Sequence, residues 1–531
     1  MKKNIKMLFL ALLALTACSK NDDISLTGPL DQPLTAGSAN FSKFVSLGNS
    51  LTSGYSDGTL FKQGQQNCFP KILADQFALV GGGAFTIPYM NDNIGGLTFG
   101  GTTIVGPRLY FNPAIGGPQP VSGIPTTEIL TTLTGPFNNM GVPGAKSFHM
   151  LAPGYGSAAG VASGQANPYF VRFRSSPSAT MLGDAVAQNP TFFSLWAGNN
   201  DVLSYATTGG IGTNQTGNTA SPATYGPNDI TDPTTFAGVY NVLINGLTSG
   251  GAKGVVANIP YVNTIPYFTT VPYNPLKSSV LGNGSVAAGD ATIALLNTNL
   301  YRPLKDALES IPGGKDRIVL LAASSATNPD PANPLLIKDE YLTNLGTQLA
   351  TVLAGAPFNF PAATAGAFGA IYGQARQATS NDYILLTSRA EINATQALVP
   401  PQINKKGITY PFEDKLVLSD GEVSELKIAT DAFNATIKSV SSSKGLAYVD
   451  ANSLLKQVAT SGGYSFGSNY VITSQYVVGG GFSMDGVHPS PRGYALIANE
   501  FFKAINLAYG SNFRPVDLGK YQIQYPAILP N

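Results

Sequence analysis

Short apolar runs alternate along the chain with stretches in which apolar residues recur at helical spacing. Runs rich in β-branched, aromatic and aliphatic side chains predict buried strands at residues 44–47, 192–196, 255–260, 318–321 and 446–449. Apolar residues three or four positions apart predict helices over residues 70–77, 235–247, 293–308, 420–437 and 491–505. Because strands and helices alternate, we expect an α/β fold with a parallel sheet covered by helices on both faces.

Two stretches interrupt this alternation. Residues 80–136 are glycine-rich and irregular, and residues 322–411 fit the alternation poorly. We therefore interpret residues 41–510 as one domain that carries both stretches as insertions, followed by a C-terminal tail over residues 511–531. Insertions of this size either form lids and substrate grooves or are solvated decoration, and the sequence leaves both open.

The composition indicates neutral, turn-rich loops. Charged residues make up 11% of the 531 residues, against about 25% in ordinary globular chains. Glycine occurs 59 times and proline 37 times. The net charge is +1 and the chain contains no basic block, so it lacks the electrostatic signature of a nucleic-acid-binding protein.

The N-terminus has the pattern of an export signal. Lys2, Lys3 and Lys6 precede an apolar stretch at 7–15, which is too short for a membrane span of about 20 residues. The sequence Leu-Thr-Ala-Cys that ends at Cys18 resembles a bacterial lipobox. This resemblance implies a signal peptide over residues 1–17, diacylation of the Cys18 thiol and a tether over residues 18–40. The alternative is an ordinary secretory signal with an incidental cysteine.

The residues after the cysteine bear on location. Ser19, rather than an aspartate, follows Cys18, which by analogy with lipoprotein sorting favours the outer membrane. Residues 20–23, Lys-Asn-Asp-Asp, weakly resemble a surface-export signal. We therefore expect a lipoprotein of the bacterial cell envelope, on either the periplasmic or the surface face.

A serine, a histidine and an aspartate stand in contexts that suggest acyl transfer. Ser50 follows the predicted strand 44–47 on a glycine turn, and His488, one of two histidines in the chain, lies three residues after Asp485. A serine nucleophile needs a base, and the base needs an acceptor that orients it. Ser50, His488 and Asp485 match these three roles.

The tetrahedral intermediate of such a reaction also needs donors aimed at its negative oxygen. Asn200 offers a side-chain amide just after the predicted strand 192–196, and the glycine turn at 139–144 offers backbone amides that a substrate can approach closely. Functional residues of parallel sheets gather outside the carboxyl ends of the strands, and Ser50 and Asn200 both lie just past a strand end.

Four segments, in their order along the chain, resemble the signature blocks of the SGNH (GDSL-type) hydrolases, a family of serine esterases and lipases. They are residues 48–51 (Gly-Asn-Ser-Leu), 141–144 (Gly-Val-Pro-Gly), 198–201 (Gly-Asn-Asn-Asp) and 485–488 (Asp-Gly-Val-His). The resemblance implies a flavodoxin-like three-layer α/β sandwich with a Ser50, His488 and Asp485 triad. It also implies an oxyanion hole formed by the Ser50 and Gly144 backbone amides and the Asn200 side chain.

The chain departs from the family pattern in two respects. Asn49 stands where the family usually has an aspartate. Because that side chain is not the nucleophile, we expect the change to tune the turn rather than abolish activity. The chain is also much longer than is usual for the family, and the resemblance does not cover residues 80–136 and 322–411.

Other motifs have simpler interpretations. Residues 463–467 match the G-x-S-x-G elbow of a different hydrolase fold, but no apolar strand precedes them, so we interpret them as a loop. His149 has no carboxylate near it in sequence and is expected to pack or to hydrogen-bond. Cys68 lacks a neighbouring base and an intramolecular disulfide partner, so we expect it to pack in the core. Two histidines and one unmodified cysteine make a zinc site unexpected.

The sequence therefore predicts a membrane-anchored ester hydrolase that works through an acyl-Ser50 intermediate and needs no metal or cofactor. Its expected partners are an ester substrate, either a lipid or an acylated glycan, and the membrane, through Cys18. One alternative is a deacetylase of O-acetylated polysaccharide. The other is a non-catalytic surface lipoprotein that binds glycan or lipid.

Overall fold

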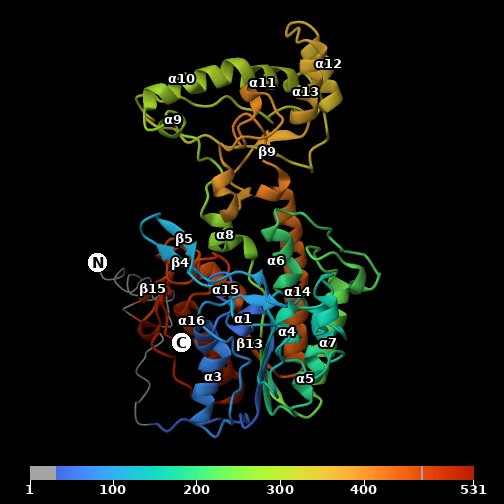
Figure 1. The fold of residues 1–531 in the computed structure, drawn as a ribbon, viewed down its shortest axis with the longest axis vertical. Coiled ribbons are helices and arrows are strands. Elements are labelled where there is room, and N and C mark those ends of the chain that lie inside the picture. The colour runs from blue at the N-terminus through green and yellow to red at the C-terminus, as the bar shows by residue number, and fades with distance from the viewer. Residues whose placement is uncertain (1–31, 468–469, 531) are drawn as a thin grey trace, which may run out of the picture.

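A computed structural model describes residues 32–467 and 470–530, and its centre is a five-stranded parallel sheet (Figure 1). The strands are β1 (Phe44–Gly48), β6 (Asn139–Gly141), β7 (Phe192–Trp196), β8 (Lys253–Ala257) and β13 (Ala447–Val449). Their order across the sheet is β13-β8-β7-β1-β6. In chain order this is 2-1-3-4-5, the doubly wound order also found in flavodoxin. The predicted parallel α/β fold is confirmed.

Successive strand residues point to opposite faces and supply two hydrophobic cores. In β7, Phe193 and Leu195 enter one core, and Phe192 and Trp196 enter the other. Helices α5 (Met181–Val186), α6 (Asn200–Thr207), α7 (Pro233–Thr248) and α14 (Asp420–Ser443) supply the first core. Helices α3 (Phe69–Ala78), α15 (Ala451–Val458) and α16 (Pro491–Tyr509) supply the second. The body is therefore a helix–sheet–helix sandwich.

The long helices begin and end where the sequence supplies caps. At α16, the Ser490 hydroxyl accepts the Gly493 N–H at 3.0 Å, Pro491 occupies the first turn, and Gly510 ends the helix at φ +68°. At α14, the Glu422 carboxylate accepts the Ser419 N–H at 2.6 Å. These signals explain why both predicted helices form.

Residues between β8 and α14 form a separate lobe beyond the sheet (Figure 1). It holds two hydrophobic cores of its own, built around Leu304 and Ile337. Its elements are α9 (Ser278–Leu281), α10 (Val286–Leu296), α11 (Arg302–Glu309), β9 (Leu336–Lys338), α12 (Gly346–Ala354), α13 (Ala362–Tyr372), β10 (Ala375–Gln377), β11 (Tyr383–Ile384) and β12 (Val417–Leu418). Residues 322–411 lie in this lobe.

One predicted helix–strand pair belongs to the lobe and not to the sheet. The helix expected at 293–308 exists as α10 and α11 joined by a π-helical turn over Asn297–Tyr301. The strand expected at 318–321 is wrong, because these residues have no strand partner. Ile318 and Leu321 are instead buried against the lobe helices. A short apolar run indicates burial, but it does not indicate which core receives it.

Most of residues 80–136 is irregular, as predicted, but residues 97–120 within this stretch form two hairpins. The strands are β2 (Leu97–Phe99), β3 (Thr102–Val105), β4 (Leu109–Asn112) and β5 (Gly117–Pro120). Beside them the buried Arg108 donates to the carbonyls of Asn93, Pro526 and Ala527 at 2.7–3.0 Å. This segment therefore holds part of the C-terminal tail against the body.

The remaining elements are short. They are α1 (Ser50–Ser53), α2 (Lys62–Gln66), α4 (Pro168–Val171), α8 (Pro266–Thr269), β14 (Tyr464–Phe466) and β15 (Tyr470–Ile472). The loop expected at 463–467 is wrong, because β14 and β15 pair as an antiparallel hairpin. Ser465 is exposed on β14 and does not sit on a strand-to-helix elbow. The predicted signal peptide, Cys18 and Ser19 lie outside the described residues. Within those residues no helix has the length and apolar content of a membrane span.

Candidate active site

Three of the predicted blocks meet at the carboxyl edge of the sheet. Ser50 is the first residue of α1, directly after β1, and Asn200 is the first residue of α6, after β7. The turn that contains Gly144 follows β6, which pairs with β1 on its other side. Because β6, β1 and β7 are adjacent and parallel, their ends bring these loops together.

Glycine is required where the chain turns from β1 into α1. A Cβ on Gly48 would lie 2.1 Å from the Thr52 hydroxyl oxygen and 2.8 Å from the Trp196 carbonyl oxygen. Without a side chain at this position, α1 packs close to the end of β7. The turn thus brings Ser50 to the mouth of a cavity, and Ser50 itself is 6% exposed.

Asn49, the departure from the family pattern, connects two blocks. Its Oδ1 accepts the Leu51 N–H at 3.1 Å, and its Nδ2 donates to Asn199 Oδ1 at 3.1 Å. Asn49 is fully buried. One side chain therefore caps the helix that starts at Ser50 and ties that turn to the loop before Asn200.

The predicted acid–base pair is formed. His488 Nδ1 and Asp485 Oδ2 lie 2.8 Å apart. Burial alone would raise the pKa of Asp485, but the adjacent His488 and the backbone N–H groups of Val487 and His488 lower it to about 2. Asp485 is therefore ionised at neutral pH. Its carboxylate accepts the Nδ1 proton, which leaves Nε2 of His488 free to act as a base.

Residues 55–58, which the sequence did not single out, lie just after Ser50 and hold the loop that carries His488. Gly58 N–H donates to Asp485 Oδ2 at 3.0 Å, and Asp57 Oδ1 accepts the Met484 N–H at 2.8 Å. The Tyr55 ring lies 4.5 Å from the His488 ring, centroid to centroid. The Asp57-Gly58 pair is a typical turn signal, and it could have marked this segment as a tight turn.

The oxyanion candidates are linked to one another. Asn200 Nδ2 donates to the Ala145 carbonyl at 2.9 Å, next to Gly144, whose φ is +79°. The buried Asp201 carboxylate accepts both the N–H and the hydroxyl of Ser147, at 2.8 and 2.6 Å. The glycine turn at residues 141–144 is thus fixed against α6. Asn200 lines the same cavity as Ser50 and His488, whereas Gly144 is not among the residues that line it.

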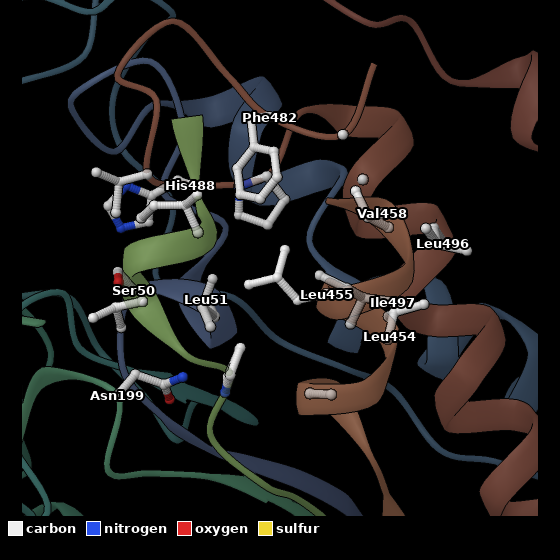
Figure 2. A pocket seen from close by; sticks show the side chains of 18 of the residues that line it. Ser50, Leu51, Asn199, Leu454, Leu455, Val458, Phe482, His488, Leu496 and Ile497 are labelled. Carbon is white, nitrogen blue, oxygen red and sulfur yellow. The ribbon is translucent and has the colours of Figure 1, made fainter. Parts of the chain in front are cut away.

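The cavity is apolar. Its volume is about 110 Å³, and it is partly open to solvent. Ser50, Asn199 and His488 lie at one end, and Leu454, Leu455, Val458, Leu496 and Ile497 lie at the other (Figure 2). A site of this kind fits a ligand that has a reactive polar end and an apolar body.

The comparisons with known proteins were negative. No family model, no curated protein and no solved structure matches the chain.

His149 and Cys68, which were given simpler interpretations, do not line this cavity. His149 stacks on Tyr155 with ring centroids 4.4 Å apart and accepts the Lys146 N–H, and burial lowers its pKa to about 4. Cys68 is fully buried, and burial raises its pKa to about 12, so a reactive thiolate is not formed there.

One group of carboxylates has the spacing of a cation site. Glu340, Asp414 and Glu422 offer oxygens within 4.8 Å of one another, where the lobe meets α14. These residues do not line the cavity at Ser50. They are therefore separate from the proposed acyl-transfer chemistry.

Proposed function

We propose that this chain is a serine ester hydrolase of the SGNH type that cleaves carboxylic esters through an acyl-Ser50 intermediate. The observation that carries the proposal is the 2.8 Å Asp485–His488 contact at the end of a cavity that Ser50 and Asn200 also line. The strand order and the order of the four blocks support the same assignment.

The geometry supports the following reaction. His488 Nε2 takes the Ser50 proton as the hydroxyl oxygen attacks the ester carbonyl, and Asp485 stabilises the imidazolium that forms. The Ser50 and Gly144 N–H groups and the Asn200 amide stabilise the oxyanion. His488 then protonates the departing alcohol, and water hydrolyses the acyl-serine with His488 again as the base. No step uses a metal or cofactor.

We also propose that the chain is a lipoprotein of the bacterial cell envelope, anchored in the outer membrane through Cys18. The sequence of residues 1–23 supports this part of the proposal. An enzyme held at a membrane would have lipid esters within reach. Incorporation of labelled palmitate, lost in Cys18→Ser, would test the anchor.

The two alternatives receive less support from the site. A deacetylase of O-acetylated glycans would use the same triad, but an acetyl group would leave most of the apolar walls of the cavity without a contact. A non-catalytic binding protein gives no reason for an ionised Asp485 to orient His488 in a cavity that Ser50 also lines.

Replacement of the nucleophile is the direct test. Ser50→Ala should lower kcat of the purified full chain on p-nitrophenyl butyrate by at least about 10³-fold, because no acyl-enzyme can form. Ser465→Ala is the matched control, since Ser465 is the exposed serine of the G-x-S-x-G sequence. Unchanged turnover in Ser50→Ala, or loss in Ser465→Ala, would reject the assignment of the nucleophile.

The oxyanion role of Asn200 can be tested separately. Asn200→Ala should lower kcat by about 10²- to 10³-fold with little change in KM, because the donor acts on charge that develops in the transition state. Asn241→Ala is the control, because Asn241 is exposed on α7 and its amide donates only to the Ala237 carbonyl of the same helix. An Asn200→Ala variant with normal kcat would remove Asn200 from the oxyanion hole.

A further inference from the structure

The cavity at Ser50 has chemically distinct ends. The polar side chains that line it are Ser50, Asn199, Asn200, His488 and Trp196. The indole N–H of Trp196 already donates to the Asn258 carbonyl at 3.0 Å. A bound molecule would therefore find new polar partners only beside Ser50, where the ester group must sit.

The other end extends between two helices. Leu454, Leu455 and Val458 of α15 gather there with Leu496 and Ile497 of α16 (Figure 2). Ile472 of β15 also lines the cavity. Leu454, Leu455 and Ile497 are only half-buried, although each packs against the core of this face. Apolar walls that remain partly uncovered gain free energy when an apolar ligand fills the space between them.

Taken together, these features identify the occupant. Resting on the proposed function, we propose that the space between α15 and α16 holds the acyl tail of the substrate, so that the enzyme selects medium- to long-chain fatty acyl esters. An apolar tail attached to a carbonyl at Ser50 matches the order of polar and apolar walls. The cavity is partly open to solvent, so a tail longer than the enclosed space can continue along its half-buried walls.

The expected substrate profile follows from burial. Each methylene that enters the cavity should raise kcat/KM by up to about fourfold until the space is full. On p-nitrophenyl esters, the full chain should therefore prefer octanoate and dodecanoate to acetate and butyrate by at least about tenfold.

A cavity-filling variant tests the location of the tail. Ile497→Trp should lower the ratio of kcat/KM on dodecanoate to kcat/KM on acetate by at least about tenfold, because the acetyl group does not reach α16. Leu455→Trp on α15 should act in the same direction, which guards against misfolding of either variant. Leu507→Trp is the matched control, since Leu507 lies on α16 but is 88% exposed. Wild-type preference for acetate, or unchanged chain-length profiles in both folded cavity variants, would overturn the proposal.

A binding measurement separates this inference from the proposed function. If no ester is turned over, the proposed function fails, and the tail site can still be tested with dansyl-undecanoic acid. Saturable binding to the full chain that Ile497→Trp removes and Leu507→Trp keeps would support an acyl-tail site. Absence of binding by the wild type, or equal binding by Ile497→Trp, would overturn it.

Discussion

At the scale of single residues, the site depends on buried side chains that make more than one contact. Asn49 shows this most clearly, because its amide oxygen caps α1 and its amide nitrogen holds Asn199. An aspartate at position 49 would keep the acceptor for Leu51 N–H but would lose the donor. Asn49 thus keeps the cap that an aspartate would provide and adds a donor across the site.

The buried contacts of Asn49 can be measured. Asn49→Ala should lower the free energy of unfolding by about 2–3 kcal/mol, because it leaves the Leu51 N–H and the Asn199 carbonyl oxygen without these partners. Turnover should also fall, since α1 carries Ser50. Urea unfolding and ester hydrolysis would report the two effects.

Asn49→Asp is the control for the shape of the turn. It retains the acceptor for the Leu51 N–H, so it should keep more stability and more activity than Asn49→Ala. Equal stability of Asn49→Ala and the wild type would show that the two hydrogen bonds contribute little.

At the scale of elements, the edge strand β6 packs against α1, the helix that begins at Ser50. A Cβ on Gly141 would lie 2.3 Å from Ser53 N and 2.7 Å from Ser53 Cα. The contact is with the backbone of α1, which cannot move without moving Ser50. The strand therefore sets how close α1 sits to the sheet.

Gly141→Ala should consequently disturb catalysis as well as packing. We expect a loss of about 1–3 kcal/mol in the free energy of unfolding and a fall of at least about tenfold in kcat. Gly106→Ala is the matched control, because a Cβ there has no atom within 4 Å. Normal kcat in a folded Gly141→Ala variant would show that α1 tolerates the shift.

The elements also show where sequence patterns were sufficient. The strands β1, β7, β8 and β13 and the helices α3, α7, α14 and α16 were predicted, because each carries several apolar residues and most have a cap or glycine stop. The strand β6 was missed and interpreted as a turn. Its three residues, Asn-Met-Gly, have no apolar period, and it is a strand because β1 offers a free edge.

In the candidate site, too, the residues with a local sequence signal were predicted and those that depend on distant contacts were not. Ser50, Asn200, Asp485 and His488 were identified from local sequence, because each stands in a short motif that its chemistry requires. The supporting residues Tyr55, Asp57 and Gly58 were not, since they act only through contacts with residues more than 400 positions away. The apolar wall of the cavity could not be predicted from the sequence either, because helices α15 and α16 form it jointly.

At the scale of the whole molecule, the lobe is joined to the body close to the histidine loop. Tyr267 N–H on α8 donates to the Gly486 carbonyl at 2.9 Å, and the Tyr267 hydroxyl lies 3.0 Å from Thr387 Oγ1 of the lobe. Gly486 lies between Asp485 and His488. The base of the lobe is therefore in direct contact with the loop that carries Asp485 and His488.

The carboxylates Glu340, Asp414 and Glu422 form a second junction between lobe and body. Burial and the neighbouring carboxylates raise the pKa of Glu422 to about 8 and that of Asp414 to about 6, with Lys338 opposing the shift at Asp414. Glu422 Oε2 accepts the Ser419 N–H, while Oε1 is buried without a hydrogen-bond partner. The junction is therefore most stable when the Glu422 carboxyl group is protonated.

This arrangement predicts that alkaline pH weakens the molecule. The folded-state pKa of Glu422 lies above its ordinary value of 4.5, so its contribution is fully present below pH 4.5 and is lost as the pH rises through about 8. Thermal unfolding should show a Tm that falls between pH 6 and pH 9.

In Glu422→Gln, which cannot ionise, this fall should be much smaller, and the variant should be more stable than the wild type at pH 9. Parallel curves for both proteins would show that Glu422 is already ionised at pH 6. Because the lobe contacts Gly486, ester hydrolysis measured across the same range would show whether loosening this junction reaches His488.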